Sequence, residues 1–161
     1  MKERYWEMMT QFKFSQFYLD EHFGACVRVD RIITIFLAIA ASTSIGGWVI
    51  WQEYAFIWGF VIAASQVLGV INQYLPYKKR IKEISELKAK WMPIYNEAEY
   101  KWFNVERGEL TDQEINDLRY RLNKEWSELD GQYFQADVLP RNEGFVKAAE
   151  QKKNEYFAKM F

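Results

Sequence analysis

The chain has little cysteine and histidine, two residues that often build metal and catalytic centres. Among 161 residues it has one cysteine, Cys26, and one histidine, His22. These counts exclude an intramolecular disulfide and a two-histidine metal site. The sequence also lacks a Gly-rich phosphate loop and a nucleophile elbow. Its net charge of −1 is not that of a protein that neutralises nucleic-acid phosphates. We therefore expect no enzyme activity, no cofactor or metal, and no direct nucleic-acid binding.

Charge is absent from two long stretches. Residues Ile32–Ile50 and Tyr54–Tyr77 contain no ionisable Asp, Glu, Lys, Arg or His, and Glu53 lies between them. A helix of the length of Ile32–Ile50 extends about 28 Å, close to the thickness of a bilayer's hydrocarbon core. One continuous helix would bury ionised Glu53 at a cost of about 3 kcal/mol, and a turn at this residue avoids that cost. The pattern predicts a two-helix transmembrane hairpin over residues 32–77, with spans 32–50 and 54–77.

Residues typical of membrane interfaces lie at the ends of these stretches. The chain has seven Trp, ten Tyr and twelve Phe, and several of the Trp and Tyr residues surround the predicted turn. Basic residues precede the first span and follow the second, but none lies in the turn, so the positive-inside rule places both termini in the cytoplasm. The alternative is that the aromatic residues form the core of a soluble helical protein. The predicted interface anchors are Arg28, Arg31, Trp48, Trp51, Tyr54, Trp58, Lys78, Lys79 and Arg80.

Small residues recur at four-residue intervals in both spans. This spacing lets helix backbones approach closely, within the hairpin, between subunits, or both. The predicted packing residues are Ala38, Ser42, Gly46, Gly59, Ala63, Ser65 and Gly69. Polar residues in and near the spans either line a path for water or ions, or form hydrogen bonds within the hairpin and back to their own helix. The candidate pore-lining residues are Ser42, Thr43, Gln66, Asn72 and Gln73.

Helical periodicity also predicts the segments that flank the hairpin. Residues 1–31 form an amphipathic helix whose balanced charges favour packing on protein rather than on lipid. The second span is expected to run straight on into a long helix, which Pro93 kinks or divides. An apolar seam from Ile81 to Trp102 follows, and either mediates oligomerisation or meets the next helix. Glu97 and Glu99 on this helix are interpreted as solvated surface charges.

Local signals divide the rest of residues 78–161 into helices. Gly108 marks a break, and Thr111 with Glu114 forms a capping box that opens the next helix. Gly131 is expected to end that helix. A connection through Leu139-Pro140 then leads to the last helix. We therefore predict an all-α membrane protein with an N-terminal amphipathic helix (1–31), the transmembrane hairpin (32–77) and a cytoplasmic helical bundle (78–161).

This arrangement resembles the SLATT family over about Phe17 to Phe157. The resemblance covers the spans Arg31–Ile50 and Tyr54–Tyr77 and the helix Lys78–Trp102. It continues through Gly108-Glu109-Leu110-Thr111 to Leu139-Pro140 and the final Ala148–Phe157 helix. It implies an effector of a bacterial conflict or anti-phage system, located in the inner membrane. It also implies a cyclic-oligonucleotide synthase or a reverse transcriptase as a system partner. The family supplies no catalytic residue to transfer.

The leading hypothesis is an effector that oligomerises to permeabilise or depolarise the inner membrane when triggered. Two helices per chain have no closed interior, so a pore requires a homo-oligomer. The alternative is a non-conducting membrane anchor that recruits a cytoplasmic partner to the bilayer.

Overall fold

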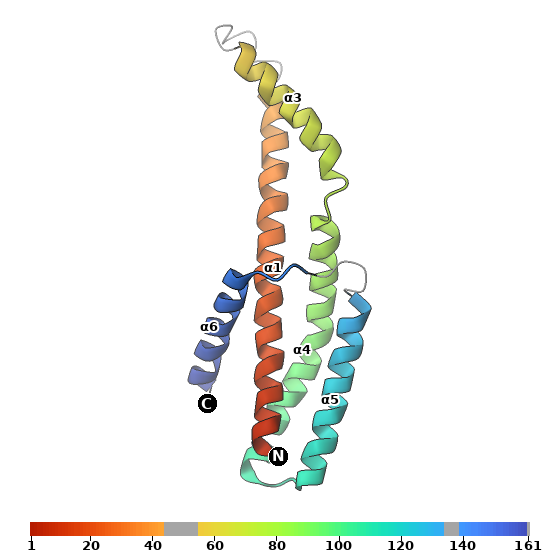
Figure 1. The fold of residues 1–161 in the computed structure, drawn as a ribbon, viewed down its shortest axis with the longest axis vertical. Coiled ribbons are helices and arrows are strands. Elements are labelled where there is room, and N and C mark those ends of the chain that lie inside the picture. The colour runs from red at the N-terminus through yellow and green to blue at the C-terminus, as the bar shows by residue number, and fades with distance from the viewer. Residues whose placement is uncertain (44–54, 134–138, 161) are drawn as a thin grey trace. The chain divides into compact units, whose positions relative to one another are not determined.

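The computed structural model is helical, with no strand, over the residues that it describes, which are 1–43, 55–133 and 139–160. Figure 1 shows the helices of these segments. Their bounds are α1 Lys2–Thr43, α3 Ala55–Asn72, α4 Tyr77–Arg107, α5 Asp112–Tyr133 and α6 Glu143–Met160. The predicted all-α class is confirmed.

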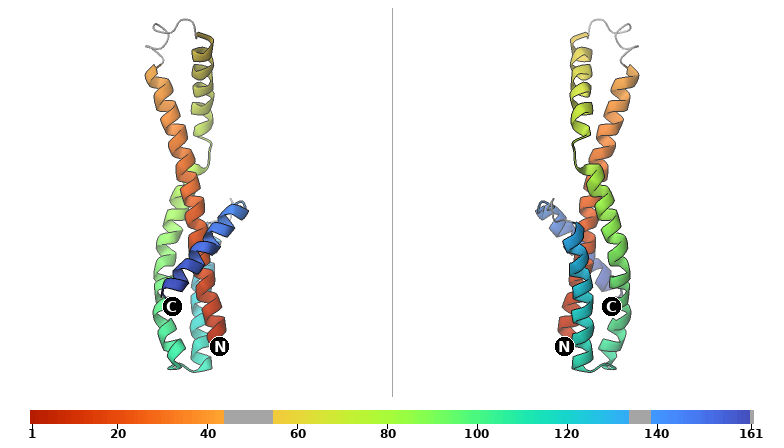
Figure 2. Two further views of the ribbon diagram at one scale, coloured as in Figure 1. Left: turned by 90° about the vertical axis from the view of Figure 1, so that its left-hand side faces the viewer. Right: turned by 90° about the vertical axis from the view of Figure 1, so that its right-hand side faces the viewer.

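The chain divides into two compact units. Unit 1 comprises Met1–Phe23 and Lys82–Phe161, and unit 2 comprises Gly24–Ile81. The start of α1 therefore packs with the later helices, as its balanced charges predicted. Figure 2 shows α6 crossing this part of α1 obliquely. Residues 1–31 are one part of a longer helix, because α1 continues without a break to Thr43.

The core of unit 1 is built around stacked aromatic rings. Trp126 of α5 lies between Phe12 of α1 and Trp91 of α4, with ring centroids 4.0 and 3.9 Å away. All three side chains are buried. The predicted seam of α4 faces the same core, with Ile84 and Leu87 fully buried. The seam thus meets neighbouring helices of its own chain and is not available as a subunit surface.

Local signals account for the connection between α4 and α5. Gly108 has a φ of 73°, a left-handed conformation that glycine adopts without steric cost. The capping box forms as predicted: the Thr111 main-chain N–H donates to Glu114 Oε2 at 2.7 Å, and the Glu114 N–H donates to Thr111 Oγ1 at 3.3 Å.

Two predicted helix boundaries are wrong. The second apolar segment does not run straight into the next helix, because α3 ends at Asn72 and α4 begins at Tyr77. Pro76 explains this break, since proline lacks an N–H and disfavours helix at the residue before it. Pro93 lies inside α4, which runs without a break from Tyr77 to Arg107, so of the two effects predicted for this proline the division of the helix does not occur. The α5 helix continues past Gly131 to Tyr133, and Gly131 has no positive φ.

Candidate functional site

The apolar helices of unit 2 expose large hydrophobic side chains. Phe56 is 88% exposed, Phe60 69% and Ile32 67%. The other exposed side chains of this group are Ile35, Ile39, Ile57, Val67, Val70, Ile71 and Tyr74. Large contiguous apolar surfaces are rare on soluble monomers and mark sites that contact protein or lipid. The surface of α3 and the end of α1 is therefore the first candidate site.

Helix length and hydropathy give a separate observation on this region. Taken singly, none of the helices in the described segments has both the length and the apolar character needed to cross a bilayer. One pair of helices has the necessary length and apolar character when its two members are taken together: Phe56–Asn72 and Tyr77–Arg107, which are joined across a bend of 43°.

Residues of α1 and α3 line one cavity in unit 2. Leu37, Ala40 and Ala41 of α1, together with Ile62, Ser65 and Gln66 of α3, line a cavity of about 210 Å³. Ala40 is buried, with 4% of its surface exposed. Small side chains at 40 and 41 permit this close approach. Neither alanine was among the predicted packing residues, although the first span's composition already pointed to close packing.

Most of the predicted packing residues do not line this cavity. Ser65 lines the cavity, but Gly59 and Gly69 are exposed, and a Cβ added at either glycine would meet no atom within 4 Å. Ala38, Ser42 and Ala63 are exposed as well. Gly46 lies outside the described residues. Pairing between subunits through these positions stays a prediction.

The candidate pore-lining residues occupy different surroundings. Ser42 Oγ donates a hydrogen bond to the Ala38 carbonyl oxygen at 2.8 Å, so this hydroxyl bonds back to its own helix. Gln66 lines the 210 Å³ cavity. Asn72 is half-buried at the end of α3, and Gln73 is exposed beyond it. Thr43 is the last residue of α1. Within the described segments, these residues do not line one common channel.

The predicted interface anchors lie beside the apolar segments along the chain. Arg28, Arg31, Lys78 and Lys79 are exposed, whereas Trp58 and Arg80 are half-buried. Trp48, Trp51 and Tyr54 lie outside the described residues, as does the predicted turn at Glu53.

A second candidate site in unit 1 was missed by sequence reasoning. Tyr95 Oη donates to Glu99 Oε1 at 3.0 Å, and Tyr156 Oη donates to the same oxygen at 2.5 Å. The Lys13 Nζ lies 4.2 Å from the Tyr95 ring centroid and 3.9 Å from that of Tyr156. Glu99 is therefore a paired, half-buried acceptor rather than a solvated charge. The available signal was its position four residues after Tyr95 on the buried seam.

Burial governs the protonation of this cluster. Desolvation lowers the pKa of Lys13, opposed by the charges of Glu99 and Asp20. Desolvation also raises the pKa of Tyr95 far above its usual range, and the hydrogen bonds with Tyr156 and Glu99 add to the rise. The pKa of Tyr156 is raised by desolvation and by its hydrogen bond to Glu99. The phenols therefore stay protonated donors near neutral pH, and the cluster joins α1, α4 and α6.

Further contacts attach α6 to α1. Lys152 pairs with Glu21, and the Asn142 N–H donates to Tyr18 Oη at 3.4 Å. Asn142 also caps α6, because its Oδ1 accepts hydrogen bonds from the N–H groups of Gly144 and Phe145 at 2.9 and 3.2 Å. These contacts hold α6 against α1 within unit 1.

Metal binding has no support in the segments that the structure describes, since no three His, Cys, Asp or Glu side chains gather there. Comparison with known proteins adds no assignment: no protein-family model, no curated protein and no solved structure matches the chain.

Proposed function

We propose that this protein is a membrane effector of a bacterial anti-phage or conflict system. In this proposal its two apolar segments form a hairpin in the inner membrane, with both termini in the cytoplasm. When triggered, several copies assemble and permeabilise or depolarise the membrane. The resemblance to the SLATT family supplies the biological setting, and the surface of unit 2 supplies the physical support.

The observation that carries the proposal is a contrast between the two units. Unit 1 buries its apolar seam and its stacked aromatic rings, as a protein in water does. Among the residues that the structure describes, unit 2 exposes ten large apolar side chains, whereas the longer unit 1 exposes six. If exposing each of these side chains of unit 2 to water costs about 1 kcal/mol relative to an apolar environment, the total cost is on the order of 10 kcal/mol. An apolar surrounding removes this cost, and a bilayer provides it on all sides of the hairpin.

Assembly requires a surface that one chain does not use itself. Gly59, Ala63 and Gly69 of α3 are exposed, and their small size suits close packing with a second chain. In the proposed oligomer these residues form the contacts between copies, because hydrophobic burial does not drive helix association in lipid. Polar groups such as Gln66 then face a shared interior.

Membrane insertion is tested first. The full chain, expressed with a tag at either end, is expected to stay in the membrane fraction after a carbonate wash. Both tags are expected to resist protease added outside intact spheroplasts. A chain that remains in solution without detergent, or a tag cleaved from outside, contradicts the proposed topology.

Conduction is tested with a potential-sensitive dye in cells expressing the full chain. Gly59→Leu adds bulk where the chain's own atoms leave space, so it is expected to preserve the fold and to reduce assembly and depolarisation. The matched control is Val67→Leu, which enlarges an exposed position of the same helix. Wild-type protein that crosslinks as an oligomer without depolarising the membrane contradicts the effector proposal. If Val67→Leu reduces depolarisation as much as Gly59→Leu does, the proposal is contradicted as well.

A second candidate function is a non-conducting membrane anchor that recruits a cytoplasmic partner. The hydrogen bonds from Ser42 to the Ala38 carbonyl and from Ser65 to the Ile62 carbonyl favour it, because hydroxyls satisfied within a helix do not need a water-filled path. Ser42→Leu combined with Gln66→Leu separates the two functions. A pore loses depolarising activity with these substitutions, whereas an anchor retains partner recruitment.

A further inference from the structure

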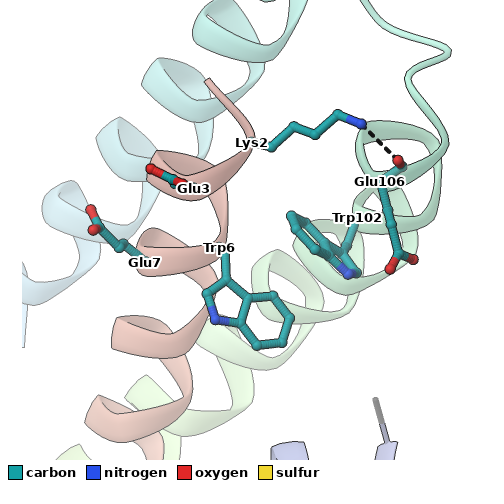
Figure 3. Close-up of a pocket in the computed structure, with 6 residues that line it drawn as sticks. All are labelled: Lys2, Glu3, Trp6, Glu7, Trp102 and Glu106. Carbon is teal, nitrogen blue, oxygen red and sulfur yellow. Dashed lines mark hydrogen bonds between the residues drawn. The ribbon is translucent and has the colours of Figure 1, made fainter.

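We propose that unit 1 carries a binding site for a polyamine, an organic cation with two or more ammonium groups. The site is a cleft of about 430 Å³ between the start of α1 and the later part of α4 (Figure 3). Its volume is within the range of small-molecule sites. The lining residues are Lys2, Glu3, Trp6, Glu7, Trp102 and Glu106. The inference is independent of membrane function, because all six residues belong to unit 1.

Two half-buried indoles form the wall of the cleft. The ring centroids of Trp6 and Trp102 are 4.9 Å apart, and their planes are inclined by 50°. Each ring also contacts a second aromatic side chain: Trp6 and Phe157 meet edge to face with centroids 4.9 Å apart, and Trp102 stacks with Tyr5 with centroids 6.2 Å apart. The Tyr5 hydroxyl is itself fixed by donating to the Ala98 carbonyl at 3.0 Å. Indole faces attract organic cations more strongly than other aromatic side chains do.

The charges around the indoles select a cation. Glu3, Glu7 and Glu106 contribute three carboxylates, against the one ammonium group of Lys2. That ammonium group is already engaged, because Lys2 Nζ donates to the Glu106 carbonyl oxygen at 2.8 Å. The cleft therefore has an excess of negative charge and aromatic surface, which does not suit an anion.

The positions of the carboxylates favour an extended cation over a compact one. In Figure 3, Glu3 and Glu7 lie to one side of Trp6, and Trp102 with Glu106 lies to the other. A polyamine placed across the indoles reaches Glu106 at one end and the side of α1 that carries Glu3 and Glu7 at the other, with its methylene groups over the rings. A single ammonium group meets only one of these acidic sides. A hydrated Mg²⁺ ion gains little from the indoles, because it releases its water reluctantly.

The test is calorimetric titration of the full chain in a non-ionic detergent, which carries no charge to bind the ligand. Spermidine is expected to bind one molecule per chain, more weakly as NaCl is raised. Glu3→Gln combined with Glu106→Gln is expected to weaken binding by roughly 25-fold, about fivefold for each charge removed near 4 Å in water. The matched control is Glu86→Gln combined with Glu128→Gln, two glutamates in ion pairs with a lysine of the same helix. It is expected to leave spermidine binding unchanged.

A second variant tests the aromatic wall. Trp6→Phe keeps a ring against Phe157 but has a weaker quadrupole, so spermidine is expected to bind about threefold more weakly. Circular dichroism melting of each variant reports whether the fold is intact. No heat from spermidine with the wild-type chain overturns the proposal, as does unchanged binding by the double glutamine variant. Equal binding of Mg²⁺ alone also overturns it, since an acidic rim without indole recognition then explains the result.

Discussion

Phe12 gives the sharpest test of where the N-terminal part of α1 packs. Its side chain is 3% exposed, and its ring stacks on Trp126 with centroids 4.0 Å apart and planes inclined by 2°. Replacing a buried phenylalanine by alanine costs about 3–5 kcal/mol, including the cavity that remains. Phe12→Ala is therefore expected to lower the free energy of unfolding of unit 1 by about 4 kcal/mol, a large share of the ~5–15 kcal/mol typical of a domain.

The assay is urea unfolding of the full chain in non-ionic detergent, followed by near-ultraviolet circular dichroism of the buried tryptophans. Phe103→Ala is the matched control, because Phe103 is on the α4 surface and 47% exposed. It is expected to cost less than about 1 kcal/mol. A double-mutant cycle with Trp126→Ala should show a coupling of roughly 0.5–1.5 kcal/mol from the stacked rings.

A lipid-bound N-terminal segment gives the opposite result. If residues 1–23 lay on the bilayer surface instead of in unit 1, Phe12→Ala would leave the urea midpoint unchanged and reduce liposome binding. That outcome would refute the assignment of this segment to the bundle core.

Three further predictions concern unit 1 and use the same unfolding assay. Asn142→Ala removes the cap of α6 and is expected to cost about 1 kcal/mol, whereas Asn142→Asp keeps the acceptor and should cost much less. Gly108→Ala places a Cβ on a residue with a φ of 73° and should destabilise by about 1 kcal/mol, while Gly131→Ala within α5 should stabilise by about 0.5–1 kcal/mol. The hydrogen bond from Arg121 holds the pKa of Glu97 below its usual range, so this pair stabilises the fold above the unfolded-state pKa and loses that effect as pH falls through the folded-state pKa. Glu97→Gln should therefore flatten the dependence of the urea midpoint on pH below the usual glutamate pKa, and an unchanged slope would contradict this role.

Signals confined to a few neighbouring residues predicted local structure well. The Thr111 and Glu114 capping box and the break at Gly108 are both present, because each depends on the backbone within one turn. The period of apolar residues likewise identified the buried face of α4. Pro76 is a local signal of the same kind, but the uncharged stretch that surrounds it hides the break between α3 and α4.

Pairings between distant parts of the chain were not predictable in this way. Glu99 interacts with residues of three helices. It accepts hydrogen bonds from Tyr95 on its own helix and from Tyr156 on α6, and its charge acts on Lys13 of α1. No spacing in the sequence relates position 13 to position 156. The same holds for the cleft at Trp6 and Trp102, whose indoles come from two different helices, α1 and α4, and lie far apart in the sequence.

The way α6 is attached gives unit 1 an order of unfolding. This helix of 18 residues buries only Ala149 and Phe157, whereas α4 buries seven side chains over 31 residues. Sparse burial lowers the free energy of local opening, so α6 is the element that separates first while the stack around Trp126 remains closed. Its backbone amides should accordingly exchange with deuterium before those of α4. Separation of α6 would also bare the ammonium group of Lys13 to water and return its proton affinity toward that of a free lysine.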